Sequence, residues 1–249
     1  MDNLWQYLGT GAHSGSFNMN LDERLAREVA QGVRPATLRF FQWQPYCISL
    51  GKHQKLDEID TTRCKAEGID VVFRPTGGRA ILHAEELTYS VVFSDQNAGS
   101  IDETYCQISR AIVAGLRALG VPAEMTSVQP DFKSLYREPS SVICFSNSAK
   151  YEIQVKGKKL VGSAQRRIAG AVLQHGSILI GPDHRRLAEF LNISDEEKLR
   201  MQGLMKEKTI EITRIKKIGL DELKGSLLES FRENFKFRVS NFNELKFSH

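Results

Sequence analysis

Two long stretches of the chain place apolar residues every three to four positions, which is the spacing of one face of an α-helix. The first stretch covers residues 16–31 and stops at Gly32, and the second covers residues 102–119 and stops at Gly120. A glycine just beyond the last periodic residue commonly terminates a helix. The apolar positions are Leu21, Leu25, Val29, Ile108, Ile112, Leu116 and Leu119. The pattern therefore predicts two amphipathic helices that pack against a core.

Shorter runs that are rich in β-branched and aromatic residues, and are bounded by turn residues, predict strands. These runs are residues 5–8, 37–42, 47–50, 71–74, 87–93, 153–155, 159–164, 171–180 and 235–239. Shorter helices are predicted at residues 60–68, 184–191, 195–206 and 221–234. Because strands outnumber helices without a regular alternation, the sequence favours an α+β fold, a sheet packed by helices, over a doubly wound one. No linker or repeat divides the chain, so residues 1–249 are expected to form a single domain.

The composition is that of an ordinary globular protein and narrows the choice of partner. Of 249 residues, 41% are hydrophobic and 26% are charged. No apolar run approaches the roughly 20 residues needed to cross a bilayer. The N-terminus lacks a basic region followed by an apolar stretch, so no secretory signal is predicted and a cytoplasmic protein is expected.

A net charge of +4 is too mild to indicate nucleic-acid binding, but it suits the docking of acidic partners on a local patch. Lysines and arginines at a strand edge can equally serve only to keep that edge solvated. The candidates for such a patch are Lys156, Lys158, Lys159, Arg166, Arg167, Arg185 and Arg186.

The segment from Arg74 to His83 places a glycine pair, Gly77 and Gly78, after an apolar strand. Paired glycines let backbone N–H groups approach a ligand closely. Arg74 and Arg79 flank the pair and favour an anionic or strongly polar group there. A tight turn between two core strands would explain a glycine pair equally well.

The four cysteines show no metal-ligand spacing, so neither a metal site nor a disulfide is predicted. Cys47, Cys64 and Cys106 fall on an apolar strand or on helices, where packing explains them. Cys144 differs, because it lies where a long polar loop, residues 125–141, meets a predicted hairpin, and small polar residues surround it. A thiolate attacks a thioester readily, which makes Cys144 the candidate nucleophile; its apolar neighbours also allow a buried cysteine.

Two segments carry a resemblance to a known family. The first is RPTGGRAILH at residues 74–83 with ELTYSVVF at 86–93, and the second is VICFSNSAKYEIQVKGKKLVGSAQRR at 142–167 with LQHGSILI at 173–180. Together they resemble the lipoate ligase and octanoyltransferase family, which attaches octanoyl or lipoyl groups to a lysine of a carrier domain. The wording is most similar to the LipM-type octanoyltransferases. The likeness runs from about Leu4 to about Ile180 and includes NMNLDE at 18–23 and TLRFFQW at 37–43.

The resemblance implies a fold and a set of site residues. The fold is a central mixed sheet packed by helices, as in biotin and lipoate protein ligases. In the family a Cys-Phe pair ahead of a Tyr-Glu strand carries the acyl group, which implies Cys144. The lysine three positions before Gly162 is Lys159, whose ammonium would face the acyl carbonyl, stabilise its oxyanion and lower the pKa of a nearby thiol.

The remaining site residues surround the reactive end of an acyl chain. Gly77, Gly78, Gly162 and Ser163 are expected to shape the backbone there. His83 and His175 have two open roles, either as structural hydrogen-bonding groups or as the base that deprotonates the thiol or the incoming amine. Together with Arg74 and Arg79 they complete the predicted substrate-binding set.

The resemblance implies a two-step transfer without a cofactor or ATP. Cys144 would take octanoyl from octanoyl-acyl carrier protein, and a lysine of the glycine-cleavage H protein or of a dehydrogenase lipoyl domain would then accept it. A monomer is expected, and neither nucleic acid nor a membrane is an expected partner. The donor, acceptor and chain length remain open.

Three alternatives stay open at this point. An ATP-dependent lipoate ligase would carry three consecutive glycines followed by His-Asp, whereas Arg79 stands at the third glycine and Ala84 follows His83. An amidotransferase that moves octanoyl or lipoyl groups from the H protein to lipoyl domains would also use a cysteine. A catalytically silent carrier-binding protein would fit if Cys144 were unreactive.

Overall fold

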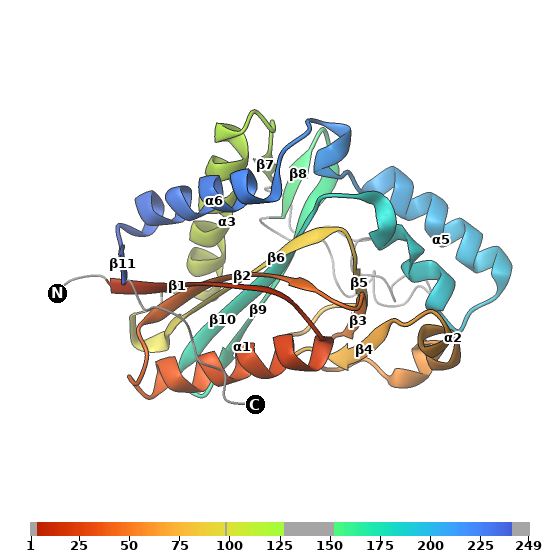
Figure 1. The fold of residues 1–249 in the computed structure, drawn as a ribbon, viewed down its shortest axis with the longest axis horizontal. Helices are drawn as coiled ribbons and strands as arrows, with labels where there is room; N and C mark the ends of the chain where they lie inside the picture. The colour runs from red at the N-terminus through yellow and green to blue at the C-terminus, as the bar shows by residue number, and fades with distance from the viewer. Residues whose placement is uncertain (1–3, 98, 127–151, 241–249) are drawn as a thin grey trace.

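The computed structural model describes residues 4–97, 99–126 and 152–240. Its centre is an eight-stranded sheet in the order β11-β1-β2-β6-β10-β9-β8-β7, and a three-stranded sheet β4-β3-β5 lies at one end (Figure 1). The strands are β1 (Leu4–His13), β2 (Ala36–Trp43), β3 (Cys47–Leu50), β4 (Asp70–Phe73), β5 (Ile81–His83), β6 (Glu86–Ser94), β7 (Glu124–Met125), β8 (Ile153–Val155), β9 (Lys158–Ile168), β10 (Ala171–Leu179) and β11 (Arg238–Ser240). The α-helices are α1 (Gly15–Ala30), α2 (Thr61–Ala66), α3 (Ile101–Ala118), α5 (Asp195–Lys208) and α6 (Leu220–Phe235). The 3₁₀ segments are η1 (Leu56–Glu58), η2 (Asp95–Asn97), η5 (Pro182–Phe190) and η6 (Ile212–Arg214).

The large sheet is mixed, as the resemblance implied. Strand β1 runs parallel to β2 and β11. The neighbouring pairs β2–β6, β6–β10 and β10–β9 are all antiparallel. All nine residues of β10 are buried, because helices or the smaller sheet cover both of its faces. The predicted α+β class is confirmed.

Helices cover both faces of the large sheet (Figure 1). Helix α1 lies along one face, where Leu21, Leu25 and Val29 pack against β6 and β10. Helices α3 and α6 lie against the other face, where Ile108, Ile112 and Leu116 belong to the largest apolar cluster. Both long helices that the apolar spacing predicted are therefore present, within one residue of the expected ends.

The small sheet has a separate apolar core with α2, η5 and α5. Its middle strand β3 pairs parallel with β4 and antiparallel with β5. Strand β5 was not predicted as a strand of its own. The segment predicted as a helix at residues 184–191 is a 3₁₀ helix over Pro182–Phe190, and β9 extends four residues beyond the predicted end at 164.

Candidate functional site

A cleft opens where the small sheet meets β6, β9, β10 and α1. It is lined by Met19, Trp43, Ser49, Arg74, Ile81, His83, Thr88, Gly162, Ser163, Ala164, His175, Gly176 and Ser177. Five of the predicted site residues are in this set, although the first and last of them, Arg74 and His175, are about 100 positions apart in the sequence. They are Arg74, His83, Gly162, Ser163 and His175.

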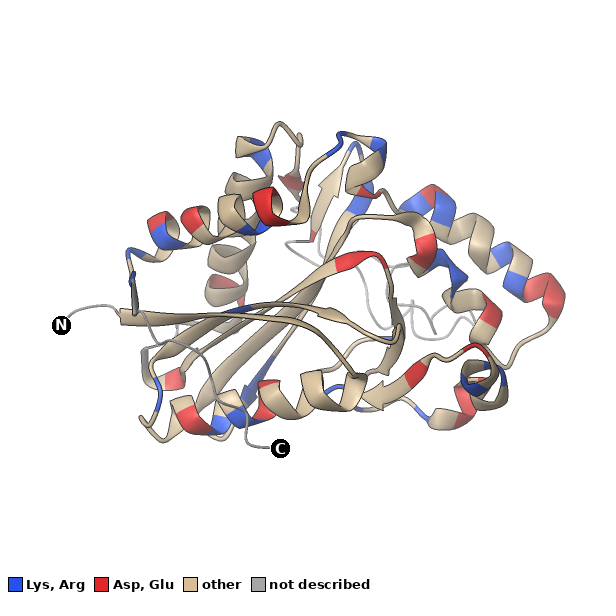
Figure 2. Ribbon diagram, viewed as in Figure 1, with Lys and Arg blue, Asp and Glu red and all other residues tan. Residues whose placement is uncertain are grey.

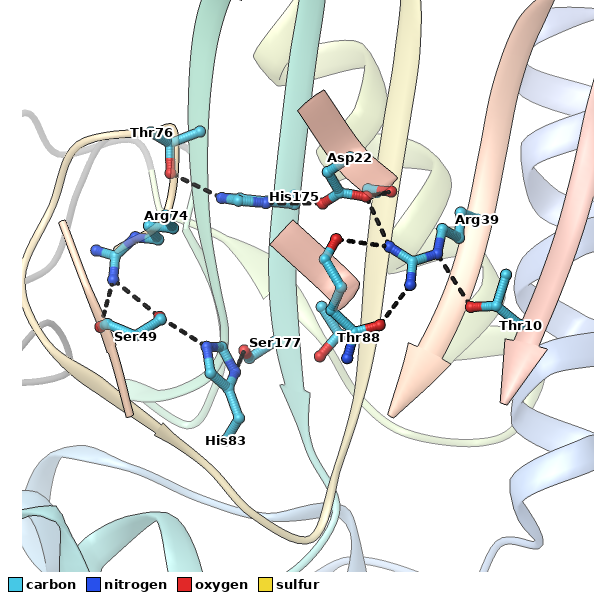
Figure 3. Close-up of polar contacts among 12 residues, drawn as sticks. Thr10, Asp22, Arg39, Ser49, Arg74, Thr76, His83, Thr88, His175 and Ser177 are labelled. Atoms are coloured by element: carbon cyan, nitrogen blue, oxygen red, sulfur yellow. Dashed lines mark hydrogen bonds and ion pairs between the residues drawn. The ribbon is translucent and has the colours of Figure 1, made fainter. Parts of the chain in front are cut away.

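His83 lies on the small-sheet side of the cleft, where Figure 3 shows it between the hydroxyls of Ser49 and Ser177. Its Nε2 is 2.7 Å from Ser49 Oγ, and its Nδ1 is 2.8 Å from Glu86 Oε1. The ring stacks on Trp43 with 4.0 Å between centroids. Trp43 in turn donates from Nε1 to Thr88 Oγ1 at 2.7 Å, so the imidazole is fixed on its edges and on one face.

Glu86 accepts three hydrogen bonds on a single oxygen. Thr88 and Ser177 donate to Oε1 at 2.5 and 2.8 Å, in addition to His83. The other oxygen, Oε2, is buried and has no hydrogen-bond partner among the described residues. Glu86 is only 2% exposed, so this oxygen is also shielded from bulk water.

His175 lies on the large-sheet side of the cleft, in a second network of the same type (Figure 3). Its Nδ1 is 3.2 Å from Asp22 Oδ2, and its Nε2 is 2.7 Å from Thr76 Oγ1. Asp22 also accepts from Arg39 Nη1 at 2.8 Å, and both members of this ion pair are fully buried. Burial alone would raise the pKa of Asp22, but Arg39 and His175 outweigh that effect and hold it below its ordinary value.

His175 is neutral near pH 7, because burial lowers its pKa more than Asp22 raises it. A neutral ring that donates from Nδ1 to Asp22 must accept at Nε2, so Thr76 is the donor there. The hydrogen bond therefore joins the segment before the glycine pair to the centre of the large sheet. In this arrangement His175 positions the loop from Arg74 to Arg79.

Arg74 stabilises the same loop from the other side. Its guanidinium donates to the carbonyl oxygens of Ser49, Gly77 and Arg79 at 2.7–3.1 Å, and to Ser49 Oγ at 3.1 Å. The side chain is 4% exposed. The sequence suggested an arginine that attracts an anion; the structure shows a buried arginine that bonds its own loop and reaches the cleft beside Ser49.

The glycine pair makes a turn that a neighbouring strand end approaches closely. Gly78 has a φ of +93°, which glycine adopts without strain. A Cβ on Gly51 would come 2.0 Å from the Gly78 carbonyl oxygen, so Gly51 must also lack a side chain. Arg79, the other flanking arginine, is half-buried, and its carbonyl accepts from Arg74.

Gly162 and Ser163 form the opposite wall of the cleft on β9. Ser163 Oγ is 2.7 Å from Tyr89 Oη, which also accepts from Gln174 at 2.9 Å. Burial raises the pKa of Tyr89 to about 12, so its hydroxyl stays protonated. A Cβ on Gly176 would meet the Gly162 carbonyl at 2.6 Å, and this close packing keeps the wall narrow.

Lys159 is buried on β9, three residues before Gly162. It is 4% exposed, and its ammonium forms an ion pair with Glu152, which is 5% exposed. At about 3.3 Å per residue, its Cα lies roughly 10 Å along the strand from Gly162. Lys156 is exposed and Lys158 half-buried, so Lys159 is the buried lysine of this hairpin.

Two of the described cysteines, Cys47 and Cys64, are poor nucleophiles. Burial raises the pKa of Cys47 well above its ordinary value, and the pKa of Cys64 to about 11. Both therefore hold their protons at neutral pH. Cys106 is half-buried on α3. Cys144, the predicted nucleophile, lies outside the described residues, and so does most of the loop predicted at 125–141.

The basic residues proposed as a docking patch are mostly paired within the protein. Arg166 donates to the Pro75 carbonyl at 2.7 Å, and Arg167 pairs with Asp95. Positive and negative segments are interspersed over the helices rather than gathered on one face (Figure 2). Arg185 and Arg186 pair with Glu211, Glu67 and Glu189.

Two classes of site receive no support from the described residues. Within the described ranges, no group of three His, Cys, Asp or Glu side chains is arranged to hold a metal ion. Among residues 4–97, 99–126 and 152–240, no helix combines the length and apolar character of a membrane span.

Several residues of the two networks had no role assigned from the sequence. For two of them the sequence held a signal, which is a charged residue at a position where the pattern predicts burial. Such residues are rarely fully buried without a partner, so the two could have been predicted to pair. Asp22 follows an apolar position of the first helix, and Arg39 interrupts an apolar strand. Ser49, Thr76 and Glu86 carried no such signal, since their partners come from distant segments.

Comparison with known proteins identifies the family. A family model described as the lipoyl protein ligase A/B catalytic domain matches residues 14–232. The chain belongs to this family. An octanoyltransferase LipM from Exiguobacterium sp. is 37% identical over 238 residues, covering 93% of this chain and 86% of that protein. Another from Kyrpidia tusciae is 39% identical over 236 residues, covering 92% and 86%.

These relatives confirm the predicted family and its acyltransferase branch. A solved structure of a bipartite lipoate protein ligase from Thermoplasma acidophilum superposes with a TM-score of 0.75 and 22% identity, covering 95% of this chain and 87% of that one. At this identity the likeness supports the fold alone. It agrees with the predicted ligase-like architecture.

Proposed function

We propose that the protein transfers octanoyl from octanoyl-acyl carrier protein to a lysine of a lipoyl-carrier protein, through a thioester on Cys144. Relatives named octanoyltransferase LipM align along more than nine-tenths of the chain. The structural observation that carries the proposal is Lys159. It is a buried ammonium on the strand that forms one wall of the cleft.

The chemistry needs no external energy source. The Cys144 sulfur bonds to the acyl carbon, the carbon–sulfur bond of the donor breaks, and the donor leaves as a thiol. The acceptor amine then bonds to the same carbon and Cys144 is released as a thiol. An amide is more stable than a thioester, so the second step runs downhill.

Lys159 serves as the positive charge for the developing oxyanion. An ammonium has three donor hydrogens, so it can donate to more than one oxygen at a time. A charge buried this deeply acts through a lower dielectric than water and needs no reorganisation during the reaction. Glu152 compensates for the burial of the ammonium before substrate arrives.

The decisive test is incubation with octanoyl-carrier protein, without ATP, followed by intact-mass analysis of the enzyme. We expect an octanoyl adduct that hydroxylamine removes, and no such adduct on Cys144→Ser. Undiminished hydroxylamine-sensitive adduct on Cys144→Ser would exclude this cysteine. Transfer that requires free octanoate and ATP would show a ligase instead.

Lys159→Met should slow adduct formation about 100- to 1,000-fold, as does the loss of one oxyanion donor in other acyl-transfer enzymes. Because the substitution strands a buried carboxylate, the double variant Lys159→Met with Glu152→Gln should be measured beside it. Lys206→Met, at an exposed lysine on α5, is the control and should react as the parent does. A rate within threefold of the parent in the folded double variant would remove Lys159 from the mechanism.

A further inference from the structure

Ser49, His83 and Glu86 form a continuous hydrogen-bonded chain from the cleft into the protein interior. The two links measure 2.7 and 2.8 Å. Ser49 and His83 line the cleft, and Glu86 closes the buried end. All three are at most 5% exposed, so water does not compete for these hydrogen bonds.

The neighbouring groups fix the direction of the hydrogen bonds from Ser49 through His83 to Glu86. Glu86 is an acceptor, so His83 donates from Nδ1, and the neutral ring then accepts at Nε2. Ser49 supplies that hydrogen, because its oxygen already accepts from Arg74 Nη1 at 3.1 Å. A hydroxyl with one such donor keeps a second lone pair available to a group in the cleft.

Glu86 differs from Asp22 in its charged neighbours. Glu86 contributes a buried negative charge, and one of its oxygens has no hydrogen-bond partner among the described residues. Among the described residues, no arginine or lysine forms an ion pair with Glu86, whereas Asp22, beside His175, is paired with Arg39. A proton that reaches His83 Nε2 through Ser49 would therefore make an imidazolium in direct hydrogen-bond contact with the Glu86 carboxylate.

We propose that Ser49 removes a proton from the acceptor lysine during amide formation, with His83 and Glu86 as its proton relay. The inference rests on the proposed function, since it concerns the second step of that transfer. A lysine amine has an ordinary pKa of about 10.4 and loses its first proton to water before it attacks. The step itself removes a second proton from nitrogen.

The bonds and protons of this step balance. The amine nitrogen bonds to the acyl carbon while its proton passes to Ser49 Oγ, and the proton of Ser49 passes to His83 Nε2. The bond from the acyl carbon to the thioester sulfur breaks. The proton then returns from His83 through Ser49 to the departing sulfur, so the products are an amide and a thiol.

The test uses two acceptors on one isolated octanoyl-enzyme. Hydroxylamine is a neutral nucleophile at pH 7 and needs little help from a base, whereas the lysine of a lipoyl-carrier protein needs it. Ser49→Ala should slow single-turnover transfer to lysine about 100-fold or more, and Glu86→Gln about tenfold, as expected for general-base catalysis. Cleavage by hydroxylamine should stay within about threefold of the parent.

His175→Gln is the matched control, because His175 is also a buried histidine between a hydroxyl and a carboxylate. This substitution should slow octanoyl transfer to lysine and to hydroxylamine to a similar extent, as expected of a residue that positions the loop. If Ser49→Ala and Glu86→Gln slowed transfer to lysine and to hydroxylamine equally, the relay would be wrong. The relay would also be wrong if neither substitution slowed transfer to lysine. Both outcomes would leave the proposed function intact. Failure of the parent to form any octanoyl adduct would instead refute the proposed function, and the relay with it.

Discussion

The two buried histidines of the cleft have similar partners and different charge balance. Each lies between a side-chain hydroxyl and a carboxylate, with hydrogen bonds of 2.7–3.2 Å. The carboxylate beside His175 is neutralised by the buried guanidinium of Arg39. Among the described residues, the carboxylate beside His83 has no arginine or lysine partner, and one of its oxygens has no hydrogen bond.

This difference separates a structural network from one suited to proton transfer. Asp22 already has its cation, so it gains little from a proton on His175, and burial favours the neutral ring. His175 thus holds Thr76 and the glycine turn in place. His83 instead joins the Glu86 carboxylate to the Ser49 hydroxyl at the cleft, which is the arrangement that the proposed relay uses.

Removing the negative charge from each network tests the difference between the two carboxylates most strongly. Asp22→Asn leaves Arg39 fully buried without its counter-charge, so we expect the free energy of unfolding to fall by about 3–5 kcal/mol. In Glu86→Gln the amide oxygen can stand where Oε1 accepts its hydrogen bonds, and the amide nitrogen where Oε2 has no partner. We therefore expect the free energy of unfolding to fall by only about 1–2 kcal/mol. Urea denaturation measures both. Equal losses would show that the two carboxylates have the same role in stability.

The fold was largely predictable because its long elements have strong periodic patterns. Leu21, Leu25 and Val29 predicted α1, and the run from Leu87 to Phe93 predicted β6. Strand β5 was missed, because Ile81–His83 becomes a strand only by pairing with β3, which lies more than 30 residues earlier. The sequence also did not predict that β3 belongs to a separate small sheet. Its pairing depends on contacts between Cys47–Leu50 and segments more than 20 residues away.

The site was only partly predictable for the same reason. The resemblance indicated His83 and His175 but left both roles open. Their roles depend on Glu86, Asp22 and Arg39, which come from three different elements and meet only in the folded chain. The role of Cys144 remains a prediction, because it lies outside the described residues.

A second test uses the acid dependence of stability. The unfolded chain protonates histidine near pH 6.5, whereas folded His175 has a lower pKa. Between these two values the unfolded state binds more protons, so acid favours unfolding and stability is lost as pH falls below about 6.5. One histidine contributes at most about 1.4 kcal/mol per pH unit in this window. Chemical denaturation across pH 5–8 should show a shallower slope for His175→Gln than for the parent; an unchanged slope would mean that His175 is not held neutral by the fold.

The smallest expected effect comes from the hydroxyl that His175 holds. Thr76→Val keeps the shape of the side chain but leaves Nε2 of His175 without a donor, which should cost about 1 kcal/mol of stability. The glycine turn remains attached through Arg74 and through the hydrogen bond from the Lys52 N–H to the Thr76 carbonyl at 3.0 Å. Transfer to hydroxylamine and to lysine should therefore decline together and by less than in His175→Gln. A loss confined to the lysine acceptor would place proton transfer on the His175 side of the cleft and reverse the assignment of the two histidines.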